Sequence, residues 1–188
     1  MTNDIIYYNT GNIDKNVQDT SPSGYGLLSL ISNYTNPVGV EIGSDVGVTA
    51  YCLLDNNSNL FINCIDPYIR YRDWNGNDLN DRDNVYEKFI SKMNVYKDRY
   101  KLYKMTSDDA VTFFKDNSLD FIFVDGLHEY DQVLKDCENY YPKLKSGGLM
   151  AGHDYNAIAG VRNAVDVFAN RNNKKVNLGM NDIWHWIK

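Results

Sequence analysis

Short apolar runs alternate with helix-like segments along most of this chain, and several runs end at a glycine or an acidic residue. The runs lie at 38–42, 60–65, 119–124 and 149–152, and a further strand is expected near 101–104. Parallel strands must be joined by crossovers, usually helices, so the alternation predicts an α/β fold built on a mostly parallel sheet. A strand as nearly continuously apolar as 119–124, in which Asp120 is the one polar residue, is typical of a sheet covered by helices on both faces.

The segments between these runs complete the predicted fold. Helices are expected from Ser21-Pro22, where proline suits a first turn, and at about 46–54, 85–93, 108–114, 130–141 and 161–168. Two short strands at 174–178 and 183–187 are expected to form a C-terminal antiparallel pair. We therefore predict a Rossmann-like, doubly wound, mostly parallel sheet of seven strands. Residues 1–188 are expected to form one domain, with an N-terminal arm at 1–20 and a substrate loop at 68–83.

Charge and composition narrow the expected partners. The chain has 25 acidic against 19 basic residues and a formal charge of -6, which argues against nucleic acid as a partner. No apolar run approaches the roughly 20 residues that cross a bilayer, and the first residues lack the order of a secretion signal. The sequence thus predicts a cytoplasmic protein that binds a small molecule and no membrane, with a homo-oligomer left open. Three cysteines without Cys-x-x-Cys spacing suit buried free thiols.

A glycine turn follows the first predicted strand and indicates a ligand site. Gly43 and Gly47 permit a tight turn, and Asp66 follows Gly43 by 23 positions, at the end of the next strand. An acid at that distance can bind ribose hydroxyls. The turn lacks the GxGxxG spacing, and Asp45 places negative charge where a dinucleotide pyrophosphate would lie. A phosphate-free nucleoside such as S-adenosyl-L-methionine is therefore favoured over NAD.

Several motifs resemble one enzyme family. These are VEIGSDVGVTAYCLL, INCIDPY, SLDFIFVDGLHEYDQVLKDCENYYPKLKSGGLMAGHDY, GVRNAVDVF and NDIWHWIK. They resemble the class I S-adenosylmethionine-dependent methyltransferases, and most closely the branch of macrolide sugar O-methyltransferases and cephalosporin-hydroxylase-like proteins. The resemblance runs from about Gly26 onward and leaves out the 68–83 segment. The pairing of VDGLHEYD with GGLMAGHDY is its most specific part.

The resemblance implies a binding site for S-adenosyl-L-methionine. Glu41 and Gly43 would line its methionine end, Asp66 would hold the ribose, and the adenine would lie near Ser107 and Asp108. The full set of implied cofactor-binding residues is Glu41, Gly43, Ser44, Gly47, Asp66, Ser107, Asp108 and Asp125.

The resemblance also implies a metal-assisted reaction. Asp125, His153 and Asp154 would hold Mg2+, although the imidazole of His153 leaves open Mn2+ or another ion that accepts nitrogen ligands. His128, expected on the first turn of the helix after Asp125, would be the general base, so His128 and Asp125 are the predicted catalytic residues. A deprotonated acceptor hydroxyl, on a sugar or a glycosylated metabolite, would then attack the sulfonium methyl group in line.

Other interpretations of these residues stay open on the sequence alone. Asp125 and Asp154 could be helix caps, because aspartate is favoured at strand-to-helix turns. His128 could be a solvated residue without a catalytic role. At the level of function, the alternatives are an NAD(P)-dependent oxidoreductase and a nucleoside-binding protein without catalysis.

Overall fold

The computed structural model describes residues 21–73 and 75–188, so the predicted arm at 1–20 and Trp74 lie outside the described residues. The helices are α1 (Pro22–Ile31), α2 (Val48–Asn56), α3 (Arg82–Met93), α4 (Ser107–Ala110), α5 (Tyr130–Tyr140) and α6 (Ala159–Arg171). The strands are β1 (Val38–Ile42), β2 (Phe61–Ile65), β3 (Tyr71–Arg72), β4 (Asp78–Leu79), β5 (Tyr100–Tyr103), β6 (Leu119–Val124), β7 (Leu144–Gly152), β8 (Asn177–Leu178) and β9 (Trp184–Ile187). Within the two described ranges, no helix combines the length and the apolar character that crossing a membrane requires.

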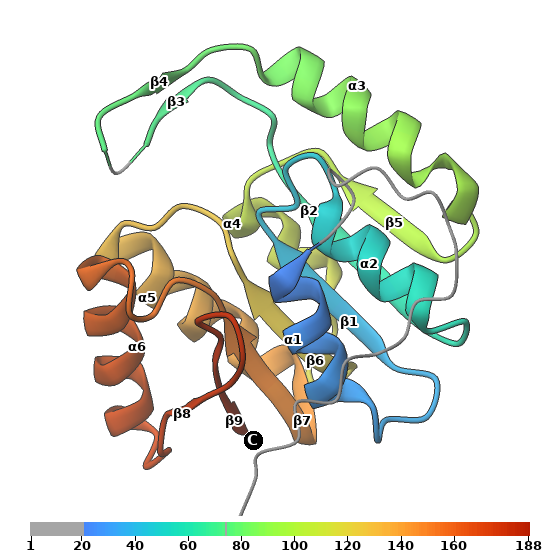
Figure 1. The fold of residues 1–188 in the computed structure, drawn as a ribbon. Helices are drawn as coiled ribbons and strands as arrows, with labels where there is room; N and C mark the ends of the chain where they lie inside the picture. The colour runs from blue at the N-terminus through green and yellow to red at the C-terminus, as the bar shows by residue number, and fades with distance from the viewer. Residues whose placement is uncertain (1–20, 74) are drawn as a thin grey trace, which may run out of the picture.

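A seven-stranded sheet forms the centre of the molecule, with the strand order β5-β2-β1-β6-β7-β9-β8 (Figure 1). β1, β2, β5, β6 and β7 pair in parallel, whereas β9 is antiparallel to both β7 and β8. The predicted Rossmann-like sheet with its C-terminal antiparallel pair is confirmed. The chain runs outward from β1 through β2 to β5, and then returns to β6 on the other side of β1. This reversal creates a crevice at the carboxyl ends of β1 and β6.

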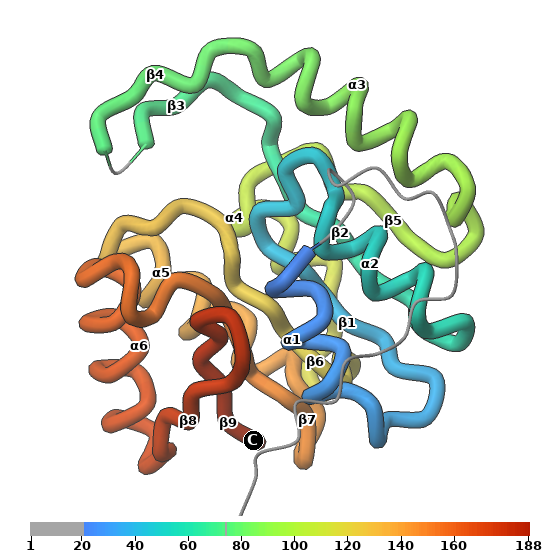
Figure 2. The backbone as a smooth tube through the Cα atoms, in the orientation of Figure 1, coloured from blue at the N-terminus to red at the C-terminus, as the bar shows by residue number. Residues whose placement is uncertain are grey.

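Both faces of the sheet are covered by helices, as the continuous apolar strands predict (Figure 2). Successive residues of β6 point to opposite faces. Phe121 and Phe123 pack in a cluster with residues of α1, α2 and α3. Ile122 and Val124 pack in a second cluster with residues of α5 and α6. The sheet is thus the middle layer of three, and its carboxyl edge is left for a ligand.

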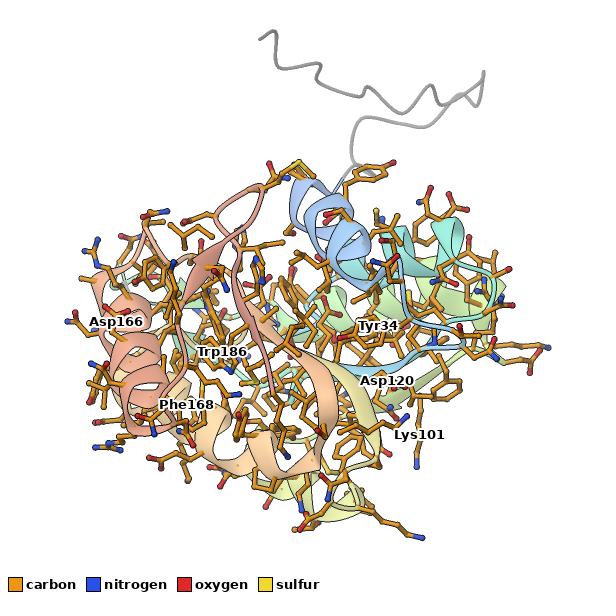
Figure 3. The ribbon with its side chains drawn as sticks, turned by 90° about the horizontal axis from the view of Figure 1, so that it is seen from below. Tyr34, Lys101, Asp120, Asp166, Phe168 and Trp186 are labelled. Carbon is orange, nitrogen blue, oxygen red and sulfur yellow. The ribbon has the colours of Figure 1, made fainter. Side chains whose placement is uncertain are left out.

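The C-terminal strand is fixed to the sheet by aromatic packing. Trp184 and Trp186 are buried, their rings stack with centroids 5.2 Å apart, and Trp186 also stacks on Phe168 of α6. Figure 3, the view from below, shows Trp186 and Phe168 beside each other. Asp120, also labelled there, accepts hydrogen bonds from the Val38 backbone N–H and the Lys145 ammonium. The Asp120 contacts lie at the amino ends of β1 and β6, away from the crevice, whereas Trp184 pairs with Gly152 at the carboxyl end of β7.

The 68–83 segment differs from the irregular loop that its composition predicts. It contains the antiparallel pair β3 and β4, which lies above the sheet in Figure 1, and it ends in the first turn of α3. The turn between the two strands is built on Asp73, whose carboxylate accepts hydrogen bonds from the backbone N–H groups of Asn75 and Asn77. Local side-chain to backbone bonds of this kind order a polar sequence that has no hydrophobic periodicity.

Candidate active site

The crevice at the strand ends contains a cavity of about 440 Å³. This volume is within the usual range for small-molecule sites. The cavity is lined by predicted site residues from four strand ends, namely Gly43, Asp66, Ser107, Asp108, Asp125 and His128. The acidic strand ends therefore converge on one place.

A smaller cavity of about 170 Å³ adjoins the first, and Gly43 and Asp125 line both. Glu41 and Ser44 line only the smaller one. Gly47, a predicted cofactor residue, lines neither cavity. It precedes α2 in the left-handed conformation, and a β-carbon there would lie 2.9 Å from the Phe89 ring. The structure therefore gives Gly47 a turn and packing role.

Gly43 forms the turn that brings the strand ends together. Its φ is +87°, and a β-carbon at this position would overlap the backbone carbonyl of Asp125. Its N–H donates to the Ile65 carbonyl at the end of β2. Only glycine combines this backbone conformation with so close an approach to a neighbouring strand end.

Glu41 is a buried carboxyl group next to this turn, with 2% of its surface exposed. Burial, opposed by a hydrogen bond from Ser44 and assisted by the carboxylates of Asp125, Asp66 and Asp45, raises the pKa of Glu41 to about 8. Its Oε2 has no hydrogen-bond partner within the described part of the chain. An unpartnered buried oxygen is costly, so a ligand that brings hydrogen-bond donors fits this position.

Asp66 lies at the end of β2, as predicted, but a residue that the sequence analysis did not select is bound to it. Its carboxylate accepts hydrogen bonds from the backbone N–H groups of Tyr68 and Asp45, at 2.8 and 3.0 Å. The Nη2 of Arg82 lies 3.3 Å from each of its two oxygens. The Nη1 of Arg82 donates to Asp45 at 2.8 Å. The two contacts with Arg82 are longer than the two with backbone N–H groups.

The pairing with Arg82 also bears on the argument against a dinucleotide. Asp45 does lie beside the cavity, but its charge is paired with a guanidinium. The repulsion that Asp45 would exert on a pyrophosphate is therefore weaker than the sequence suggests.

Asp125, His128 and Asp154 form a compact group of potential metal ligands, with ligand atoms all within 4.8 Å of one another. His128 Nε2 lies 2.8 Å from Asp154 Oδ2 and 3.8 Å from Asp125 Oδ1. His153 contacts the same two carboxylates, with Nδ1 3.1 Å from Asp154 Oδ1 and 3.8 Å from Asp125 Oδ1. His153 and Asp154 line neither cavity, whereas His128 lines the larger one.

His128 is not on the first turn of a helix, which corrects the prediction. α5 begins at Tyr130, and His128 lies in the loop that precedes it. Burial alone would lower the pKa of the His128 imidazole, but the carboxylates of Asp125 and Asp154 outweigh burial and raise the pKa to about 9. The imidazole is therefore protonated at neutral pH unless another cation neutralises these carboxylates.

Asp154 is held in an uncommon conformation between the two histidines. Its φ is +62°, in the left-handed region that aspartate, asparagine and histidine adopt more often than other residues with a side chain. Burial would raise the pKa of Asp154, but the imidazoles of His128 and His153 lower it well below its usual range. In turn, the hydrogen bond of His153 to Asp154 and the nearby charge of Asp125 raise the pKa of His153. The carboxylate lies between His128 and His153, and Asp154 does not cap a helix, since α6 starts at Ala159.

A family model described as a methyltransferase domain matches residues 40–155, from β1 to just beyond β7. The chain belongs to the methyltransferase family. All the residues predicted for the site lie within the matched stretch, and the family predicted from the sequence is confirmed. The match does not support the oxidoreductase alternative.

Known proteins resemble this chain in sequence or in fold, in each case at low sequence identity. An uncharacterised protein of Acanthamoeba polyphaga mimivirus is 27% identical over 120 residues, which are 62% of this methyltransferase and 50% of the viral protein. The chain spans half or less of the length of the curated relatives it matches. The O-methyltransferase NovP superposes with a TM-score of 0.65 and 16% identity, over 88% of this chain and 77% of NovP. An O-methyltransferase from Bacillus cereus in complex with SAH superposes with a TM-score of 0.59 and 15% identity, over 92% and 84%.

The structure adds a polar cluster that the sequence analysis of this methyltransferase missed. Asp136 is 1% exposed, lines the larger cavity with Gln132, and accepts hydrogen bonds from Ser107 Oγ at 2.6 Å and Gln132 Nε2 at 3.1 Å. A sequence signal was present, because Gln132 and Asp136 are one turn apart beside the apolar stripe of α5. Arg82 left no such signal, since it lies between Asp81 and Asp83 in a polar stretch.

Proposed function

We propose that this methyltransferase transfers the methyl group of S-adenosyl-L-methionine to a hydroxyl group of a small acceptor, with the help of a divalent metal ion. One observation carries the proposal. Three elements lie together at one crevice. The first is the unpartnered buried oxygen of Glu41, and the second is Asp66, an acid placed to bind a ribose. The third is the cluster of two carboxylates and two imidazoles around Asp154. These elements suit the methionine end of the cofactor, its ribose and a divalent metal ion, and the likeness to O-methyltransferases supports the choice of oxygen as the accepting atom.

The cofactor would bind across the two cavities. Glu41 offers its unpartnered oxygen to the ammonium group of the methionine end, and Gly43 lets that end approach the backbone. Asp66 accepts hydrogen bonds from the ribose once Arg82 moves off its oxygens. The base then lies in the larger cavity between the apolar side chains of Ile65 and Leu127, close to Ser107. When bound, the cofactor supplies the electrophilic methyl group.

The metal would bind at Asp125 and Asp154, with His153 as a third ligand. Two carboxylates suit a hard divalent cation, and one imidazole suits Mn2+ better than Mg2+. When bound, such an ion neutralises the carboxylates and acidifies a hydroxyl next to it. We assign His128 to the proton rather than to the metal, because its side chain lines the cavity in which an acceptor fits and that of His153 does not.

The residues of the site then have separate roles in the proposed reaction. Asp66 and Glu41 hold the cofactor in a fixed orientation, so that the methyl group faces the cluster, and this placement supplies much of the acceleration. His128 Nε2 takes the proton of the acceptor hydroxyl after Asp125 and Asp154 are neutralised. Ile69 and Tyr71 line the larger cavity with exposed side chains, so the 68–83 segment would contact the acceptor.

The test measures binding and transfer separately. S-adenosylhomocysteine and Mn2+ binding are measured by calorimetry, and transfer of a labelled methyl group to a panel of hydroxylated acceptors is measured with and without a chelator. His128→Ala should keep both affinities and lose transfer. His153→Ala should weaken Mn2+ binding. His185→Ala, a change to a histidine of β9 outside the crevice, should alter none of these quantities.

Each alternative predicts a different result. Transfer that survives exhaustive chelation would remove the metal from the proposal. Loss of Mn2+ binding in His128→Ala would make His128 a metal ligand instead of the base. Cofactor binding without transfer to any acceptor of the panel would favour the nucleoside-binding protein without catalysis.

A further inference from the structure

A hydrogen-bonded cluster of three polar side chains borders the larger cavity where α4 and α5 meet. Ser107 Oγ donates to Asp136 Oδ1 at 2.6 Å. Gln132 Nε2 donates to the same oxygen at 3.1 Å and to Ser107 Oγ at 3.2 Å. All three residues line the cavity, and Asp136 is almost fully buried. The network joins two elements, because Ser107 begins α4 and the other two residues lie one turn apart on α5.

The network determines which way the Gln132 carboxamide is turned. The Asp136 carboxylate can only accept, and the single hydroxyl proton of Ser107 is used in its bond to Asp136, so the NH2 group of Gln132 must face both residues. Burial raises the pKa of Asp136 to about 6, which leaves it ionised at neutral pH. The Oε1 of Gln132 points away from these partners, and no hydrogen bond among residues 21–73 and 75–188 uses it.

Both carboxylate oxygens of Asp108, the acid that the resemblance placed near the adenine, already accept a hydrogen bond. Its Oδ2 accepts a hydrogen bond from the Lys135 ammonium at 2.7 Å, and its Oδ1 accepts one from Asn139 Nδ2 at 3.4 Å. Both donors lie on α5, outside the cavity lining. Gln132 Oε1 is therefore an unengaged acceptor at this end of the cavity, and Asp136 Oδ2 is another, because both hydrogen bonds to Asp136 reach its Oδ1.

We propose that Gln132 Oε1 accepts a hydrogen bond from the exocyclic amino group of the cofactor's adenine, and that Asp136 is the positioning residue that keeps the carboxamide in this orientation. This inference rests on the proposed function, which places the base in the larger cavity. It makes Gln132 the residue that distinguishes a 6-amino purine from a 6-oxo purine. With a 6-oxo purine, two acceptors face each other, because Asp136 and Ser107 prevent the carboxamide from turning over.

The test compares two ligands that differ at this one position, S-adenosylhomocysteine and S-inosylhomocysteine, by calorimetry at pH 7.5. The wild-type protein should bind the adenosyl compound about tenfold or more tightly, the size expected when a site built for a hydrogen bond meets a ligand that lacks the donor. Gln132→Leu should reduce this ratio to near one. Asp136→Leu should also reduce the ratio, because the carboxamide of Gln132 can then turn to donate to the oxo group.

The ratio of the two affinities separates positioning from stability. A purely structural role for Asp136 would weaken the binding of both ligands equally and leave the ratio unchanged. Glu138→Gln is the matched control, since Glu138 is an exposed acid of the same helix that pairs with Arg171, and it should keep the wild-type ratio. If Asp136→Leu does not fold, Ser107→Ala removes the other acceptor and should lower the ratio instead.

The measurements distinguish a failure of this inference from a failure of the proposed function. Wild-type protein that binds neither compound overturns the proposed function together with this inference. Tight binding of S-adenosylhomocysteine with an unchanged ratio in Gln132→Leu overturns the inference and leaves the proposed function in place. An unchanged ratio in both Asp136→Leu and Ser107→Ala overturns the positioning role alone.

Discussion

Glu41 is a carboxyl group whose charge depends on what binds beside it. With a pKa of about 8 it is mostly protonated at pH 7, and a cationic ammonium group next to it favours the ionised form. Binding of S-adenosylhomocysteine at pH 7 should therefore release up to about one proton, and the release should fall toward zero by pH 9. Calorimetry in buffers of different ionisation enthalpy measures this proton directly.

The control for this prediction is Glu41→Gln, which keeps the shape of the side chain and removes its proton equilibrium. The variant should bind more weakly, and its observed heat should depend less on the buffer than that of the wild-type protein. A binding heat of the wild-type protein that is the same in all buffers at pH 7 would show that Glu41 does not ionise on binding.

At the scale of elements, comparing Gly43 with Gly147 separates the cost of a left-handed backbone conformation from the cost of close packing. Both have positive φ, +87° and +79°, but a β-carbon at Gly147 meets nothing within 4 Å. Gly147→Ala should lower the free energy of unfolding by about 1 kcal/mol, the cost of a left-handed alanine. Gly43→Ala should cost at least twice as much and also weaken cofactor binding, because it separates the ends of β1 and β6. Urea denaturation measures the costs, and equal values would contradict the close-approach argument.

The first turn of α3 is tied to the end of β2 by a buried ion pair. The side chains of Arg82 and Asp66 are 9% and 7% exposed. Arg82→Met should lower the free energy of unfolding by about 3 kcal/mol, because it leaves Asp66 charged and buried. In the double variant with Asp66→Asn, the loss should be smaller than the sum of the two single losses.

The same segment contains a matched exposed pair for this measurement. Arg72 and Asp78 lie 2.9 Å apart on β3 and β4, with side chains 69% and 57% exposed. Arg72→Met should change the free energy of unfolding by about 0.5 kcal/mol or less. If Arg82→Met costs no more than Arg72→Met in denaturant unfolding, the buried pair does not anchor the segment.

For the whole molecule, the buried carboxyl groups of the site make stability depend on pH. The folded state holds a proton on Glu41 up to a pKa of about 8, whereas the unfolded chain loses it near 4.5. Between these values the folded state binds more protons, so the free energy of unfolding falls as pH rises. The wild-type protein should lose on the order of 3 kcal/mol relative to Glu41→Gln between pH 4.5 and 8, measured by denaturant unfolding at several pH values. Parallel curves for the two proteins would contradict this.

Much of the fold could be predicted because its signals are local. The run 38–42 matches β1, and Ser21 caps α1 through a hydrogen bond to the Gly24 N–H. The pair β3 and β4 was not predicted, because its order comes from bonds made by Asp73 and not from apolar periodicity. The prediction that His128 lies on a helix was wrong because helical spacing does not locate the start of a helix. The apolar spacing after Asp125 indicates α5, but residues 125–129 form a loop before the helix begins at Tyr130.

The sequence by itself determined the order of strands and helices, the methyltransferase family, and the fact that acids follow the apolar strands. These properties depend on residues close together in the chain, whose alternation and termination decide where each strand ends. Only the tertiary structure decided which side chains meet. Arg82 contacts Asp45 and Asp66, Gln132 contacts Ser107, and Glu41 keeps an unpartnered oxygen. Such pairings join separate loops and helices, and they follow from the path of the backbone and the packing of the layers rather than from local sequence.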